Sequence, residues 1–155
     1  MPRSTACNFR LLVRFCALLT LCSEPSLADR DGADPIFAPC PASLNCVSSD
    51  ASDEAHRVSA LELAVPGTQA WQAVRAAVAA LPRTRIVADT ETYLHAECKS
   101  AWFGFVDDLE LALRSELGII AVRSASRVGY FDLGVNRRRI EGIRARLVAQ
   151  GIVRK

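Results

Sequence analysis

The segment Tyr93–Ser100 alternates between two kinds of side chain with a period of two residues. One set is polar and comprises Tyr93, His95, Glu97 and Lys99. The other set is small or apolar and comprises Leu94, Ala96, Cys98 and Ser100. Because successive residues of a β-strand point to opposite faces, the pattern predicts a strand that is buried on one face and solvated on the other.

Strand-like segments also lie on both sides of this one, at Thr84–Ala88, Phe105–Leu113 and Ile119–Val128. Short turns at Asp89–Glu91 and Ser115–Gly118 separate them. Four consecutive strands with short connections favour an antiparallel meander. A further, leading strand is predicted at 58–65, where a Pro-Gly pair stops it.

One helix is predicted between the leading strand and the meander. Its apolar stripe has helical spacing and consists of Trp71, Val74, Val78 and Leu81. Thr68 is the expected N-cap, and Pro82 ends the helix.

A second helix is predicted at 137–150, with Asn136 as its N-cap and Gly151 as its stop. Three arginines occupy its first turn, where they oppose the helix dipole. We therefore expect nearby acidic groups or a bound anion to compensate them.

The predicted fold class is α+β, an open antiparallel sheet in the order β-α-β-β-β-β-α with both helices on one face. TATA-binding-protein-like and helix-grip folds share this order of elements. The likeness is one of topology only and implies no particular function, because such folds host unrelated functions. The single domain is expected to span residues 56–155, after an acidic leader and a Cys-containing loop at 29–55. Within that stretch, 40–53 is predicted to be loop.

Residues 1–28 have the layout of a secretory signal peptide, with arginines before an apolar run and cleavage expected after Ala28. The apolar run is shorter than the roughly 20 residues that span a bilayer, so no transmembrane helix is expected after cleavage. The protein is therefore predicted to be periplasmic or secreted. Cys40 and Cys46 flank a short loop and can form a disulfide in an oxidising compartment, whereas Cys98 is expected to be a buried, inert thiol.

Charge is unevenly distributed along the chain. Residues 123–155 hold nine basic and two acidic side chains, and residues 29–122 hold seven basic and fourteen acidic ones. Two interpretations remain open: an internally neutralised domain, or a basic face that binds an anion. Nucleic-acid binding is not expected, because export removes that target and the predicted mature chain has equal numbers of acidic and basic residues.

The first candidate site lies at the polar end of the last strand and the start of the last helix. It comprises Arg123, Ser124, Ser126, Arg127, Tyr130, Asn136, Arg137 and Arg138. Arginine forks match carboxylates and phosphates, so the cluster could hold an anion. Alternatively, the arginines pair with Glu97, Asp107, Asp108 and Glu110 on neighbouring strands.

A second candidate is His95 with Glu97, which share a strand face and could act as an acid–base pair. A metal site would need a third ligand from Asp107 or Asp108, and no cofactor or metal is predicted. Asp107 and Asp108 are adjacent on a strand and should therefore point to opposite faces.

Four stretches resemble a family of domains of unknown function, number 1499. They read PCPASLNCVSS, YLHAE, FGFVDDLE and VRSASRVGYFDLGVNRRRIEGIR, and the resemblance covers roughly residues 39–147. Cys98 and Lys99 depart mildly from the family pattern. The resemblance implies a bacterial-type exported or envelope-associated domain and brings no catalytic assignment.

Three functions follow as hypotheses. The first is non-enzymatic binding of a small anionic or amphipathic ligand, or of an envelope partner protein. The second is an enzyme that uses His95 and Glu97 with an arginine anion clamp, for example a hydrolase. The third is a structural role in the cell envelope.

Overall fold

The computed structural model describes residues 37–101 and 103–155. The predicted signal peptide and its cleavage site, as well as most of the acidic leader, lie outside the described residues. Within the part of the chain that is described, no helix is long and apolar enough to cross a bilayer.

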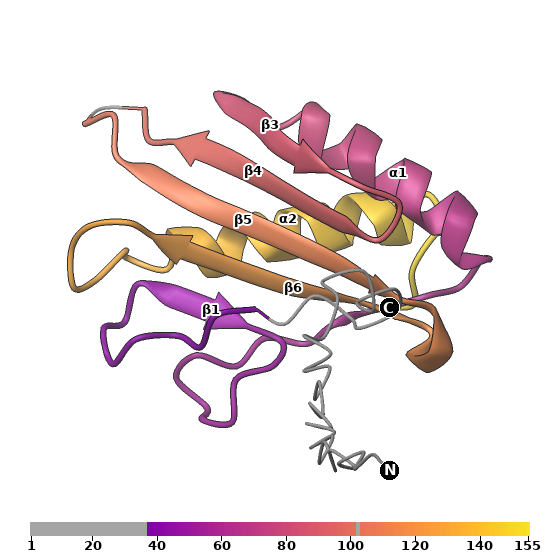
Figure 1. Cartoon of the computed structure of the whole chain (residues 1–155), viewed down its shortest axis with the longest axis horizontal. Helices are drawn as coiled ribbons and strands as arrows, with labels where there is room; N and C mark the ends of the chain where they lie inside the picture. The colour runs from indigo at the N-terminus through magenta and orange to yellow at the C-terminus, as the bar shows by residue number, and fades with distance from the viewer. Residues whose placement is uncertain (1–36, 102) are drawn as a thin grey trace, which may run out of the picture. The chain divides into compact units, whose positions relative to one another are not determined.

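The centre of the fold is the predicted meander, now seen as four antiparallel strands (Figure 1). They are β3 (Thr84–Asp89), β4 (Tyr93–Lys99), β5 (Val106–Arg114) and β6 (Ile119–Ser126). Each pairs with the next along the chain, and a short 3₁₀ turn, η1 (Ser115–Leu117), joins β5 to β6. The α+β class and the open antiparallel sheet are confirmed.

Two short strands complete the sheet on the far side of β6. β1 (Cys46–Ser48) pairs with the end of β6, and β2 (Leu61–Glu62) pairs with its start. The prediction that 40–53 is entirely loop was therefore wrong, and the predicted leading strand 58–65 is shortened to two residues. All three residues of β1 are buried, so no alternation marks it in the sequence. Its place depends on β6, whose outer backbone groups need partners.

A disulfide joins Cys40 to Cys46, as the sequence predicted. Cys46 is the first residue of β1 and is buried. The covalent ring therefore attaches the preceding segment directly to the sheet.

Both helices cover the same face of the sheet, as predicted (Figure 1). α1 (Gly67–Ala79) begins one residue before Thr68, the expected N-cap. Its N-cap is Pro66 instead. Trp71, Val74 and Val78 of its stripe are buried. The core lies between the helices and the apolar face of the meander, and it includes the Cys98 thiol, which is buried as expected.

α2 (Val135–Ala149) starts earlier than predicted, and Asn136 lies inside its first turn rather than at the N-cap. The side chain of Asp132 satisfies this end of the helix. Its two oxygens accept hydrogen bonds of 2.8 Å from the backbone N–H groups of Gly134 and Asn136. This carboxylate is one of the acidic groups expected to offset the arginines of the first turn. At the other end, Gly151 follows the helix with a φ of 69° and acts as the predicted stop.

Candidate functional site

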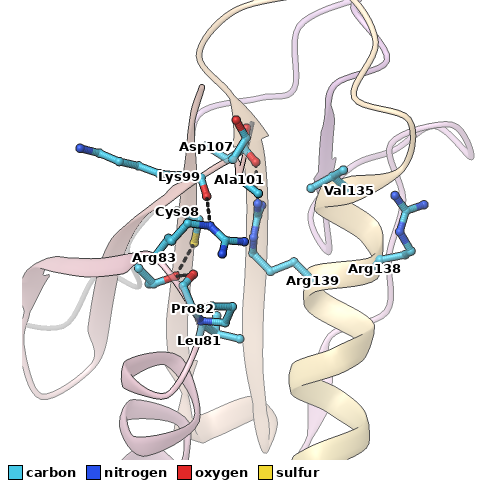
Figure 2. Close-up of a pocket in the computed structure, with 12 residues that line it drawn as sticks. Leu81, Pro82, Arg83, Cys98, Lys99, Ala101, Asp107, Val135, Arg138 and Arg139 are labelled. Atoms are coloured by element: carbon cyan, nitrogen blue, oxygen red, sulfur yellow. Dashed lines mark hydrogen bonds and ion pairs between the residues drawn. The ribbon is translucent and has the colours of Figure 1, made fainter. Parts of the chain in front are cut away.

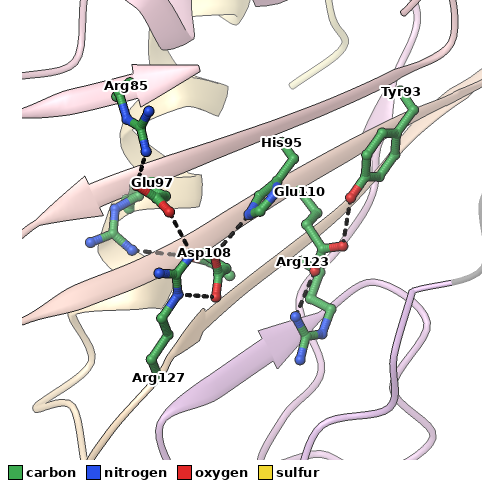
Figure 3. Close-up of polar contacts among 10 residues, drawn as sticks. Arg85, Tyr93, His95, Glu97, Asp108, Glu110, Arg123 and Arg127 are labelled. Carbon is green, nitrogen blue, oxygen red and sulfur yellow. Dashed lines mark hydrogen bonds and ion pairs between the residues drawn. The ribbon is translucent and has the colours of Figure 1, made fainter. Parts of the chain in front are cut away.

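The face of the sheet that the helices leave uncovered carries a chain of ion pairs (Figure 3). Arg127 lies just after β6, and its guanidinium donates to Asp108 on β5 at 2.8 and 2.9 Å and to Glu97 on β4 at 2.8 Å. Glu97 also accepts from Arg85 on β3 at 2.8 Å. Four neighbouring strands are thus cross-linked by alternating charges.

His95 belongs to the same chain of contacts but does not pair with Glu97. Its Nε2 atom lies 2.7 Å from Oδ1 of Asp108. Glu97 is instead held by two arginines, so the acid–base pair proposed from the sequence is not formed between these residues. The same face carries a second chain, in which Glu110 accepts from the Tyr93 hydroxyl at 2.8 Å and from Arg123 at 2.6 Å.

These contacts shift the ionisation of the groups they join. The hydrogen bond from Arg85, and then the one from Arg127, lower the pKa of Glu97 below its ordinary value. The hydrogen bond from Arg127 also lowers the pKa of Asp108, with a smaller contribution from His95. Both carboxylates are therefore ionised at neutral pH, and they match the charge of Arg127. This geometry is the ion-pair alternative left open by the sequence.

On the opposite face, under α2, lies a buried polar network. Ser124 and Asn136 are both fully buried, and the Ser124 hydroxyl donates to the Asn136 amide oxygen at 2.7 Å. Arg139 donates to both of these side chains and to Asp107, at 2.5 Å from its Oδ2 atom. The Asn136 amide also donates to the hydroxyl of Ser126 at 3.0 Å. Asp107 and Asp108 do point to opposite faces, as predicted.

The eight residues grouped at the first candidate site therefore do not form one cluster, and of them Arg138 alone lines the cleft described below. Arg123 and Arg127 lie on the open face, and the serines and Asn136 lie beneath α2. Arg137 donates to the backbone carbonyls of Ala55 and Arg57 at 3.1 and 2.6 Å. Tyr130 lies in the loop before α2 and is 69% exposed. The sheet itself separates the two faces, so these side chains do not line one cavity.

A cleft of about 450 Å³ lies where the end of α1, the end of β4 and the start of α2 meet (Figure 2). Its wall is mainly apolar and includes Leu81, Pro82, Cys98, Ala101 and Val135. Its charged groups are Arg83, Lys99, Arg138, Arg139 and Asp107. Apart from Arg138, none of these charged residues belonged to the predicted anion site.

Asp107 neutralises only one of the four cations of the cleft, because its partner is Arg139. Arg83 donates to the backbone oxygen of Lys99 at 3.3 Å, and Arg138 donates to the backbone oxygen of Leu133 at 2.8 Å. Arg83, Lys99 and Arg138 form no ion pair with a carboxylate of residues 37–101 or 103–155. The cleft therefore combines an apolar wall with positive charge that no carboxylate in the described part of the chain pairs with.

Arg83 is held in an uncommon backbone conformation at the edge of this cleft. Its φ is 54°, in the left-handed region that residues with a Cβ atom rarely adopt. The backbone N–H of Lys99 donates to the Arg83 carbonyl at 3.0 Å, which holds the turn against β4. The sequence showed that a basic residue, Arg83, directly follows Pro82, and this was a signal for the basic edge of the cleft. Residue spacing did not predict that Arg83 contacts Lys99 at the end of β4.

The molecule is thus a small α+β domain with a self-neutralised sheet face and a basic cleft beside its second helix. The chain belongs to the family described as protein of unknown function (DUF1499), whose model matches residues 37–147. This confirms the resemblance found in the sequence. No curated protein and no solved structure matches the chain.

Proposed function

We propose that the domain is a non-enzymatic binding module for a small amphipathic anion, held in the cleft beside α2. The observation that carries the proposal is the combination of an apolar wall with Arg83, Lys99 and Arg138, which have no carboxylate partner among the described residues. A cleft of about 450 Å³ is within the roughly 300–1,000 Å³ range of small-molecule sites.

The chemistry of the cleft favours a ligand with an anionic head and an apolar body. Arginine presents a planar fork of N–H donors that matches a carboxylate, sulfate or phosphate. The apolar wall around Leu81 and Val135 would bury the body of such a ligand. A purely inorganic anion would leave this wall unused, so we expect it to bind more weakly.

This proposal keeps the ligand class inferred from the sequence but moves the site. The charges of Arg123 and Arg127 are already matched by Glu110, Glu97 and Asp108. The enzymatic alternative is less well supported, because Glu97 is bound by two arginines and is a poor proton acceptor while they hold it. We also propose that the domain is exported, and the disulfide at β1 supports an oxidising compartment.

Thermal unfolding of the full chain with decanoate, decyl sulfate, decanol and inorganic phosphate tests the proposal, with each amphiphile below its micellar range. We expect decanoate and decyl sulfate to raise Tm more than decanol or phosphate do. The double variant Arg83→Ala with Arg138→Ala should lose this stabilisation. Arg85→Ala is the matched control, because Arg85 lies two residues away but pairs with Glu97 on the open face. Equal ligand-induced shifts in the double variant and the control would rule out the cleft as the site.

A further inference from the structure

Large apolar side chains are exposed mainly in two loops. Six of the ten such residues among those described lie either before β5 or between β6 and α2. They are Phe103, Phe105, Val128, Tyr130, Phe131 and Leu133. Phe103 is 79% exposed and Leu133 is 72% exposed. Exposed apolar residues gathered in this way mark an interaction site more often than isolated ones do.

The two loops lie at the same end of the sheet, as Figure 1 shows. The first runs from the end of β4 to the start of β5, and the second leaves the end of β6. The backbone N–H of Arg127 donates to the carbonyl of Val106 at 3.1 Å, which joins the bases of the two loops. Adjacent strands are about 4.8 Å apart, so the loops emerge side by side. We call the residues 100–105 and 127–134, without Trp102, the loop surface.

Positive charge flanks the loop surface. Lys99 precedes the first loop, and Arg138 follows the second and donates to the Leu133 carbonyl. Neither forms an ion pair with a carboxylate in the described part of the chain. The acidic side chain within the second loop, Asp132, is engaged by two backbone N–H groups at the start of α2. The arginines of the open face, by contrast, are paired with carboxylates.

We propose that the loop surface docks on a membrane that contains anionic lipids. Tyrosine is favoured at the membrane–water interface, where its ring meets acyl chains and its hydroxyl stays hydrated, and exposed Phe and Leu side chains add apolar area that can enter the acyl boundary. Cations beside them attract anionic headgroups over roughly a Debye length. Two protruding loops with aromatic residues and flanking cations fit a bilayer surface, and the unmatched charge specifies that its lipids are anionic. The loop surface shares Lys99 and Arg138 with the cleft, but its exposed apolar side chains lie outside the cleft, so the inference holds whether or not the cleft takes a ligand.

Hydrogen exchange of the full chain with lipid vesicles tests the proposal at the level of each loop. The vesicles contain phosphatidylcholine alone or phosphatidylcholine with phosphatidylglycerol. We expect exchange to slow in peptides covering both loops when phosphatidylglycerol is present, and the slowing to weaken as salt is raised. The turn 115–118 at the other end of β5 provides an internal reference that should not change. This local comparison is independent of any vesicle binding by residues 1–36.

A variant pair makes the test specific. Replacing Phe103, Phe105 and Leu133 together by Ser should abolish the slowing, and all three residues are exposed, so the fold should be retained. Leu117→Ser is the matched control, because Leu117 is 64% exposed but lies in η1. The triple variant keeps every residue of the cleft, so its stabilisation by decanoate should be unchanged. Slowing that persists in the triple variant overturns the proposal, as does the absence of slowing with the unmodified chain, which would favour a protein partner.

Discussion

Asp107 on β5 and Arg139 on α2 form a buried ion pair, with 2.5 Å between Oδ2 and Nη2. Asp107 is 5% exposed, and the same guanidinium donates to Ser124 on β6. One arginine from the helix thus connects two strands of the sheet beneath it. This contact positions the first turn of α2, from which Arg138 and Val135 line the cleft.

Replacing Arg139 by Leu should reduce the free energy of unfolding by about 3 kcal/mol, because it leaves a buried carboxylate without its charged partner. Replacing Asp107 by Leu in the same chain should recover part of this loss, since neither charge then remains buried alone. Urea unfolding of the two variants measures both effects. If Arg139→Leu alone lowers the free energy of unfolding by less than about 1 kcal/mol, the ion pair is solvated rather than buried.

The open face should make the domain sensitive to acid. The pKa of Glu97 is lowered from 4.5 and that of Asp108 is lowered from 3.8 by their arginine partners. Their contribution to stability is therefore complete above these ordinary values and is lost as the pH falls through the lower folded-state pKa values. Tm measured from pH 6 downwards should fall less steeply in Glu97→Gln with Asp108→Asn than in the unmodified chain. Glu116→Gln, in the exposed turn η1, should leave the slope unchanged.

Tyr93 should respond to alkali in the opposite direction. Burial, and then the hydrogen bond to the Glu110 carboxylate, raise the pKa of Tyr93 above its ordinary value of 10.0. The unfolded chain therefore releases this proton at a lower pH than the folded one, and stability is lost as the pH rises above 10.0. Ultraviolet titration in a Tyr130→Phe background isolates Tyr93, because the chain has 2 tyrosines. Tyrosinate absorbance that rises around pH 10 while the domain remains folded would contradict this prediction.

The Cys40–Cys46 disulfide should stabilise the edge of the sheet through β1. A closed ring of this size reduces the entropy of the unfolded chain and is worth about 2 kcal/mol. Replacing both cysteines by Ala should lower the free energy of unfolding by about that amount, as measured in urea. Reducing agent should have the same effect on the unmodified chain and none on the variant. An effect of reductant on the variant would point instead to another cysteine.

Prediction from the sequence succeeded where neighbouring residues carried the information. The alternation at 93–100 identified β4 and the direction of each of its side chains, and Asp107 and Asp108 were correctly assigned to opposite faces. β1 was missed because three consecutive buried residues have no period, and its partner on β6 is remote in the chain. Local rules predicted Thr68 and Asn136 as the N-caps of the two helices. In the structure the N-caps are Pro66 and Gly134.

The residues of the predicted anion site are not brought together into one cluster, for a related reason. Because successive strand residues alternate between faces, Arg123 lies on the face opposite Ser124 and Ser126, and Arg127 shares its face. Only the register of the sheet decided that the arginines meet Glu110, Glu97 and Asp108, and that their charge is neutralised there. The cleft was not anticipated, because Arg83 and Arg138 come from elements that are distant in the chain and meet only after the helices pack.

The sequence alone determined the four strands of the meander and the two helices, and which side of each is apolar, because periodicity is a local property of the chain. It also determined membership of the DUF1499 family over residues 37–147. The tertiary structure decided which charges pair with a carboxylate and which, around the cleft and the two loops, have no such partner among the described residues. Coulomb interactions depend on separation in space, and strand register and helix packing set that separation between residues far apart in the chain.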